Sequence, residues 1–192
     1  MNKSLTVIDI NPIPVAIVTC PGLFTQYEKE AIKNIEIITN SNSNLSSFAI
    51  SKSYNILNDM SLHRLQKLFD SCVEEYVKKI LELDMSFKCI GSWVTKNSKG
   101  SSHHNHFHPN SLISTVAYFS EDEENPGLNF ETKGLSNVFQ TNLFKFQNLY
   151  DDKSNKYNSF SVNVTPGQEG VIVFPSHLYH QGIPAIRMKD IW

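Results

Sequence analysis

Histidine is the residue whose spacing in this 192-residue sequence points most directly to chemistry. Six of the seven histidines fall in two short stretches: His103, His104, His106 and His108 in the first, and His177 and His180 in the second. An isolated histidine is usually structural, but imidazole nitrogens gathered in strand-like segments are typical ligands of transition metals. The clustering therefore predicts a metal site, and the alternative is a polar surface loop with incidental histidines.

The parity of an extended strand narrows the set of ligands. Side chains two residues apart share a face, so the three even-numbered histidines of the first stretch should point one way and His103 the other. His106 and His108 would then form a two-ligand unit on one strand. His177 and His180 are an odd number of residues apart, so only one can point inward, and we expect His180. Two ligands from one strand and one from another leave coordination positions open, as in non-haem Fe(II) enzymes.

The second half of the chain reads as a series of short strands separated by turn signals and without intervening helices. Strands are expected over residues 87–95, 112–119, 128–132, 160–165 and 170–174. This pattern of short strands and turns favours an antiparallel barrel or jelly roll. A long polar and aromatic insertion, residues 133–159, is predicted to be either a lid that borders the metal pocket or a loop at the remote end of the barrel.

The first half of the chain is expected to supply strands and helices that pack on the barrel. Two short strands come before residue 20, and apolar periodicity predicts helices over residues 24–38 and 61–83, the second with Ser61 as its N-cap. Residues 39–53 read as a loop. We expect a single domain, 1–192, in which residues 1–85 pack against a core of residues 86–192.

The composition argues against several classes of partner. The formal net charge is -2 with no basic field, so nucleic acid is an unexpected ligand, and the apolar runs are too short to span a membrane. Three widely spaced cysteines, Cys20, Cys72 and Cys89, read as buried free thiols rather than a disulfide framework. With no long apolar stretch at the N-terminus, these features predict a cytoplasmic protein.

Two blocks of sequence resemble a family of 2-oxoglutarate-Fe(II) oxygenases found largely in marine bacteria and their phages. Gly91-Ser-Trp-Val94 and His106-Phe-His-Pro-Asn-Ser-Leu-Ile-Ser-Thr-Val-Ala-Tyr-Phe119 match its first block, and Gly170-Val-Ile-Val-Phe-Pro-Ser-His-Leu-Tyr-His180 its second. The resemblance implies a mainly β, cupin-like double-stranded β-helix with flanking N-terminal helices. It also implies Fe(II) and 2-oxoglutarate as cofactors, with His106, His108 and His180 as metal ligands. A phage-encoded member would act in the host cytoplasm.

Two departures from the family pattern keep alternatives open. The wider superfamily has Asp or Glu at the second ligand position, where this chain has His108, so three neutral imidazoles would hold the iron. The alternatives are therefore a three-histidine cupin-type dioxygenase that works without 2-oxoglutarate, and a non-enzymatic jelly-roll binding or structural module. The family's terminal arginine strand would begin about where this sequence stops.

The resemblance also assigns candidate contacts for 2-oxoglutarate. Arg187, seven residues after His180, is the first candidate for gripping the distal carboxylate, and Lys189 is the second. Tyr118 is a candidate hydrogen-bond donor to the cosubstrate, although a core tyrosine is the more ordinary interpretation, and Trp93 is expected in the core rather than against the substrate. The substrate itself, a small molecule or a protein side chain, is left unidentified.

Overall fold

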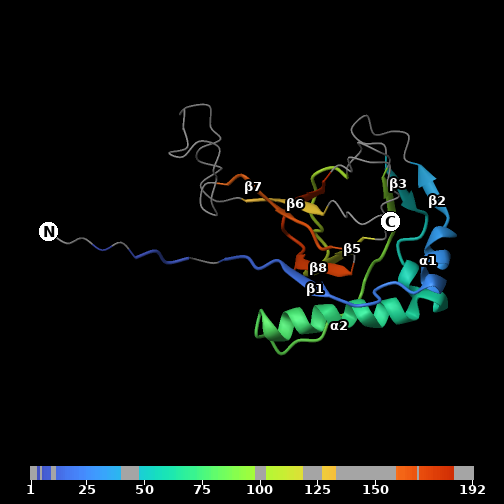
Figure 1. The fold of residues 1–192 in the computed structure, drawn as a ribbon, viewed down its shortest axis with the longest axis horizontal. Coiled ribbons are helices and arrows are strands. Elements are labelled where there is room, and N and C mark those ends of the chain that lie inside the picture. The colour runs from blue at the N-terminus through green and yellow to red at the C-terminus, as the bar shows by residue number, and fades with distance from the viewer. Residues whose placement is uncertain are drawn as a thin grey trace.

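The computed structural model describes residues 4, 6–9, 12–39, 48–97, 103–118, 127–132, 159–167 and 169–183. Within these ranges the chain is mainly β, with three small antiparallel sheets and two α-helices, which confirms the predicted class (Figure 1). The sheet at the centre of the molecule has the order β1-β8-β5, formed by Ala16–Thr19, Gly170–Pro175 and Ile113–Ala117. A second has the order β7-β6-β9, formed by Ser161–Val164, Leu128–Glu131 and His180–Gly182. The third has the order β2-β3-β4, formed by Ile37–Thr39, Phe48–Ser51 and Thr95–Asn97.

Strand β8 is buried on both faces because its apolar side chains alternate between two clusters. Val171 and Val173 pack into the cluster that includes Cys72, Tyr76 and Val77 of helix α2 (His63–Lys79). Figure 1 accordingly shows α2 lying along one side of the β1-β8-β5 sheet, with β6 and β7 on the other side. The intervening residues of β8 face that other side.

The opposite face of β8 joins the two central sheets. Ile172 and Phe174 belong to a cluster with Leu128 and Phe130 of β6. The Phe130 and Phe174 rings meet edge to face with centroids 5.0 Å apart. A strand buried on both faces needs an unbroken apolar run, which explains the sequence from Gly170 to Phe174.

The helices are shorter than the sequence predicts. Helix α1 spans Gln26–Lys33, because residues 37–39 pair with β3 instead of continuing the helix. Helix α2 follows two short 3-10 turns, Ile56–Asn58 and Met60–Leu62. Its predicted N-cap is wrong: α2 begins after Leu62, which makes no side-chain capping hydrogen bond. Ser61 lies in the preceding 3-10 turn, where its backbone N–H donates to Asp59 Oδ1 at 2.8 Å.

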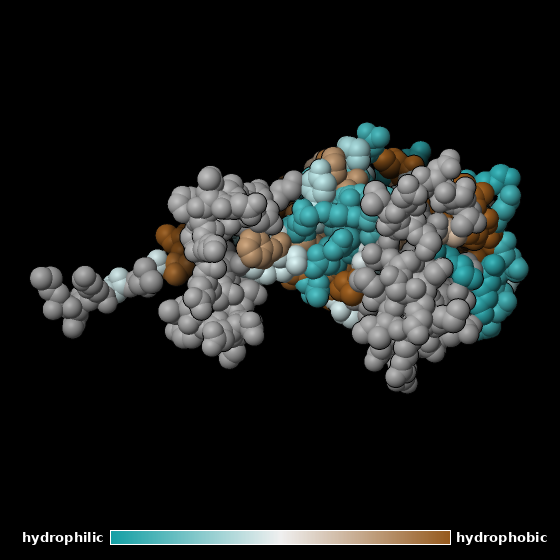
Figure 2. Space-filling view, turned by 90° about the horizontal axis from the view of Figure 1, so that it is seen from above, coloured by the Kyte–Doolittle hydropathy of each residue, from teal (hydrophilic) through white to brown (hydrophobic). Residues whose placement is uncertain are grey.

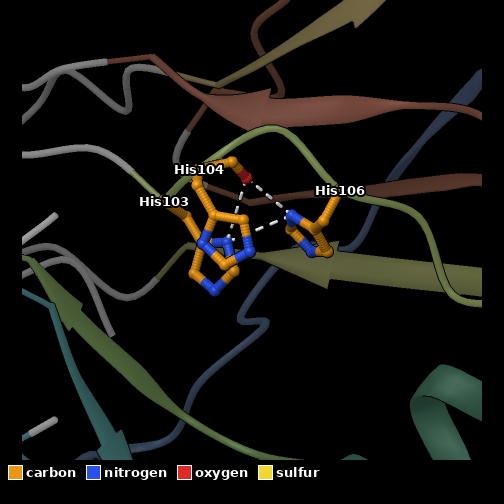
Figure 3. Close-up of side chains that lie close together, drawn as sticks. All are labelled: His103, His104 and His106. Atoms are coloured by element: carbon orange, nitrogen blue, oxygen red, sulfur yellow. Dashed lines mark hydrogen bonds between the residues drawn. The ribbon is translucent and has the colours of Figure 1, made fainter. Parts of the chain in front are cut away.

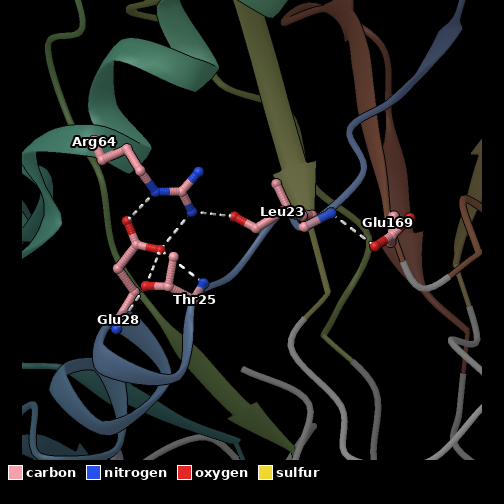
Figure 4. A network of polar contacts seen from close by, with 6 residues as sticks. Leu23, Thr25, Glu28, Arg64 and Glu169 are labelled. Atoms are coloured by element: carbon pink, nitrogen blue, oxygen red, sulfur yellow. Dashed lines mark hydrogen bonds and ion pairs between the residues drawn. The ribbon is translucent and has the colours of Figure 1, made fainter.

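An ion pair between the buried Glu28 and the half-exposed Arg64 connects α1 to α2. Thr25 and Glu28 form a capping box at the start of α1, and Glu28 is only 2% exposed. Arg64 Nε donates to Glu28 Oε1 at 2.8 Å, and Arg64 Nη2 donates to the Leu23 carbonyl at 2.8 Å (Figure 4). This network fixes the chain that leads from α1 back to β1.

Four of the five strands expected in the second half are present near their predicted positions, as β5, β6, β7 and β8. The predicted strand over residues 87–95 is wrong, because this stretch forms one isolated bridge, between Asn55 and Ser92, before β4 begins at Thr95. The predicted loop over residues 39–53 contains β3. The bridge partner of Ser92 is Asn55, and β3 pairs with the remote β4 as well as with the nearby β2. Local sequence pattern did not reveal these pairings.

Several predictions lie outside the described residues, namely Arg187, Lys189 and residues 133–158 of the insertion. Among the described residues, no helix combines the length and apolar character needed to cross a membrane. Seen from above, the described surface carries broad hydrophilic areas with smaller apolar patches among them (Figure 2). The division of the chain into domains stays a prediction.

Candidate metal centre

The backbone brings the three expected metal ligands together from two segments remote in sequence. His106 and His180 form an antiparallel bridge in which each backbone N–H donates to the other's carbonyl at 2.9 Å. Two residues on, the His108 N–H donates to the Ser176 carbonyl at 2.9 Å. As a result, one ring nitrogen from each of His106, His108 and His180 lies within 4.8 Å of the others.

Backbone carbonyls orient two of the three rings. His106 Nδ1 lies 2.7 Å from the His104 carbonyl oxygen, and His180 Nδ1 lies 2.9 Å from the Leu178 carbonyl oxygen. A carbonyl oxygen only accepts, so each Nδ1 carries the proton and each Nε2 keeps its lone pair. Such outer contacts fix the tautomer and the ring direction of a metal-binding histidine.

Aromatic side chains enclose the site on two sides. His180 is 2% exposed, and its ring lies 4.8 Å from Phe174 and 5.9 Å from Phe130, centroid to centroid. The Trp93 ring lies 5.5 Å from His108. Trp93 is 39% exposed, so the expectation that it belongs to the core is wrong. Its partly exposed ring lies beside the site, next to His108. The Tyr54 ring is the next neighbour, 6.1 Å from the Trp93 ring, centroid to centroid.

Burial keeps the imidazoles neutral. Desolvation, and then the proximity of His106, lowers the pKa of His108 to about 4. Desolvation also lowers the pKa of His180 to about 4, against a smaller opposing effect of the Leu178 carbonyl. The pKa of His106 is lowered as well, chiefly by burial. Three neutral imidazoles with their lone pairs near one point fit Fe(II), although the set brings no negative charge to the metal.

The predicted pairing of His106 and His108 agrees with the triad, whereas the predicted orientation of His103 is wrong. His177 is exposed whereas His180 is buried, as expected. His103, however, does not point away from its neighbours: it forms a second group with His104 and His106, again within 4.8 Å. Residues 103–105 belong to no strand, so the alternation of an extended strand does not govern them.

Tyr118 is a core residue whose hydroxyl group has no hydrogen-bond partner among the described residues. It is 6% exposed and packs in the cluster that contains Phe130 and Phe174, the two rings that contact His180. Burial raises the pKa of its hydroxyl group. Within the described part of the chain this hydroxyl makes no hydrogen bond. Buried hydroxyls are nearly always hydrogen-bonded, so this orphaned donor fits an oxygen atom of a bound cosubstrate.

A buried serine pair supports the ligand strands and was missed in the sequence. Ser176 is fully buried, and its Oγ lies 2.7 Å from Ser114 Oγ. Its backbone accepts from His108 and donates to Leu112, so this residue fastens β8 to the segment that carries the ligands. The signal in the sequence was its place in the second family-like block, between Phe174 and His180.

Comparison with known proteins agrees with this geometry. Residues 91–189 match the family described as "Putative 2OG-Fe(II) oxygenase". The crystal structure of a Pseudomonas putida prolyl-4-hydroxylase is similar, with a TM-score of 0.55 over 93% of this chain and 89% of that chain. Their sequences are 11% identical, so this likeness concerns the fold alone. No curated protein sequence matches the chain. The family match covers 99 of 192 residues, and the chain therefore belongs to the 2-oxoglutarate-Fe(II) oxygenases, enzymes that use Fe(II) and 2-oxoglutarate.

Proposed function

We propose that this oxygenase is a hydroxylase in which His106, His108 and His180 hold Fe(II). The observation that carries the proposal is the meeting of three neutral imidazoles within 4.8 Å, with two of the rings oriented by carbonyl oxygens. Three ligands on one side of a metal leave the remaining coordination positions to cosubstrate and oxygen. The substrate would be a small molecule or a protein side chain.

The proposal includes a double-stranded β-helix as the scaffold. Its support is the face-to-face packing of the β1-β8-β5 and β7-β6-β9 sheets through Phe130 and Phe174. The bridge from His106 to His180 adds the ligand segment to the edge of the second sheet. Ligands placed on paired backbone are held more rigidly than ligands on loops.

Bound Fe(II) and 2-oxoglutarate would supply the oxidising chemistry, with decarboxylation of the cosubstrate to succinate. The protein's own contribution is to bind, orient and exclude water. The buried hydroxyl of Tyr118 would donate to an oxygen of the cosubstrate, and Phe130 and Phe174 would keep water from the inner side of His180. The exposed rings of Trp93 and Tyr54 would contact the substrate beside His108. Arg187 and Lys189 stay candidates for the grip on the distal carboxylate.

One observation favours a second candidate function. The described triad contains an imidazole, His108, at the position where the wider superfamily has a carboxylate, and three-histidine iron sites also serve dioxygenases that need no 2-oxoglutarate. The two candidates differ in one measurable property. Only the first requires 2-oxoglutarate to bind beside the metal and to be converted to succinate.

The test uses the full chain loaded with Fe(II) without oxygen. Adding 2-oxoglutarate should produce a visible charge-transfer absorption, and admitting oxygen should release succinate. His180→Ala and His108→Ala should lose iron, measured by metal analysis after desalting, while the exposed control His177→Ala should retain it. Iron binding without an effect of 2-oxoglutarate would favour the second candidate. Loss of iron from His177→Ala but not from His180→Ala would refute the proposed triad.

A further inference from the structure

A second histidine group lies directly beside the proposed iron site. His103, His104 and His106 converge from one short segment, with their ring nitrogens within 4.8 Å of one another (Figure 3). His104 is exposed and His103 is half-buried, so solvent reaches the group. His106 belongs to both groups, which means that the two sites share a ligand.

Two ring nitrogens in this group lie at hydrogen-bond distance, a separation that two ligands of one metal ion also adopt. His103 Nδ1 lies 3.1 Å from His106 Nδ1. Two imidazole nitrogens bound about 2.1 Å from the same ion, at angles between about 90° and 109°, are themselves about 3.0–3.4 Å apart. The ring centroids of His103 and His104 lie 4.7 Å apart, so the third ring is close by. A small movement of the exposed His104 ring would complete the set.

We propose that His103, His104 and Nδ1 of His106 form a second site for a divalent transition metal, and that this site competes with the iron triad for His106. Imidazole-rich sites of this kind take zinc, nickel, cobalt or copper. The inference rests on the proposed function only where it concerns competition, because the three histidines would bind a metal whatever the triad does.

The competition follows from the tautomers of a neutral imidazole. A neutral ring has one protonated nitrogen and one lone-pair nitrogen. When the Nδ1–H of His106 donates a hydrogen bond to the His104 carbonyl oxygen, at 2.7 Å, the Nε2 lone pair is the ligand for the triad. A metal on Nδ1 moves that proton to Nε2 and removes His106 from the triad. The two sites therefore fill alternately, and a metal other than iron in the second site would inhibit the enzyme.

The experiment uses Co(II) as the probe, followed by its visible absorption and by titration calorimetry. In His180→Ala, which disables the triad, one Co(II) should still bind through the second group. Adding His104→Ala to that background should weaken binding by at least about 10-fold, because even outer contacts of a metal ligand change affinity by about 10- to 100-fold. Adding His177→Ala, a nearby exposed histidine, should change nothing. His108→Ala serves as a second background, since His180 is buried and its loss can harm folding.

The outcomes separate this inference from the proposed function. The inference fails if folded His180→Ala and His108→Ala both bind no Co(II), or if His104→Ala has no effect in those backgrounds. Two equivalents of Co(II) on the unmodified chain would refute the competition. The double variant His103→Ala, His104→Ala keeps the backbone carbonyl that orients His106, so it should bind Fe(II) as the parent does. If neither the parent nor this double variant binds Fe(II), the proposed triad fails while the Co(II) result on His180→Ala still stands.

Discussion

Tyr118→Phe should stabilise the cofactor-free protein and weaken its affinity for 2-oxoglutarate. Tyr118 is 6% exposed. Its hydroxyl makes no hydrogen bond in the described part of the chain. Leaving a buried donor without a partner costs about 1–3 kcal/mol of folding free energy. Removing the oxygen while keeping the ring should recover part of that cost, so we expect a gain of about 1 kcal/mol. In a chain of this size that gain raises Tm by about 2–4 °C.

The same substitution should weaken the binding of 2-oxoglutarate. A hydrogen bond from a buried hydroxyl to a carboxylate contributes about 1.5–3 kcal/mol. Its loss should weaken 2-oxoglutarate binding by about 10- to 150-fold, because each 1.4 kcal/mol corresponds to about a factor of ten. The stability is measured by urea unfolding without metal, and the affinity by calorimetry with Mn(II) in place of iron.

Tyr76→Phe is the matched control for this experiment. Tyr76 is also buried, but its hydroxyl donates to the Pro14 carbonyl at 2.8 Å. Its removal should therefore destabilise the protein by about 1 kcal/mol and leave 2-oxoglutarate affinity unchanged. If Tyr118→Phe behaves like Tyr76→Phe in both measurements, the hydroxyl of Tyr118 has no role with the cosubstrate.

Three further substitutions test other parts of the site and its support. His108→Asp should retain iron, because it restores the carboxylate of the wider superfamily on the same face; iron retained as well in His108→Ala would exclude residue 108 as a ligand. Trp93→Ala should weaken iron binding several-fold by freeing the ring of His108, whereas Trp93→Phe should stay near the parent in the same metal titration. Glu28→Gln should lower the free energy of unfolding by about 1–2 kcal/mol, measured by urea unfolding at pH 7. We expect no larger loss because Arg64 is half exposed and solvent screens its charge. Burial alone would raise the pKa of Glu28, but the hydrogen bonds from Arg64 and Thr25 outweigh it and lower that pKa. The stabilisation is thus present above the ordinary pKa of a carboxyl group and disappears as the pH falls through the lowered value, so an unchanged acid dependence in Glu28→Gln would contradict this assignment.

The sequence determined the elements whose pattern is local. The unbroken apolar run from Gly170 to Phe174 requires a strand buried on both faces, and β8 is that strand. The periodicity of residues 61–83 fixed the position of α2 along the chain to within a few residues. Each of these two features follows from the covalent geometry of neighbouring residues. Only His180 of the second histidine stretch is buried, as predicted, but residues 176–179 lie outside any strand, so strand alternation is not the reason.

Tertiary pairing decided what the local pattern left open. His106 lies opposite His180 because two remote segments pair in one register, and a shift by a single residue would have turned the ligands apart. Residues 37–39 form a strand instead of the predicted helix because their backbone pairs with β3. His103 turned toward His106 because its segment lacks a strand partner that would impose alternation. Backbone hydrogen bonds between distant segments are set by the packing of the whole chain, and for this reason the sequence named the candidate ligands whereas the fold determined which of them meet.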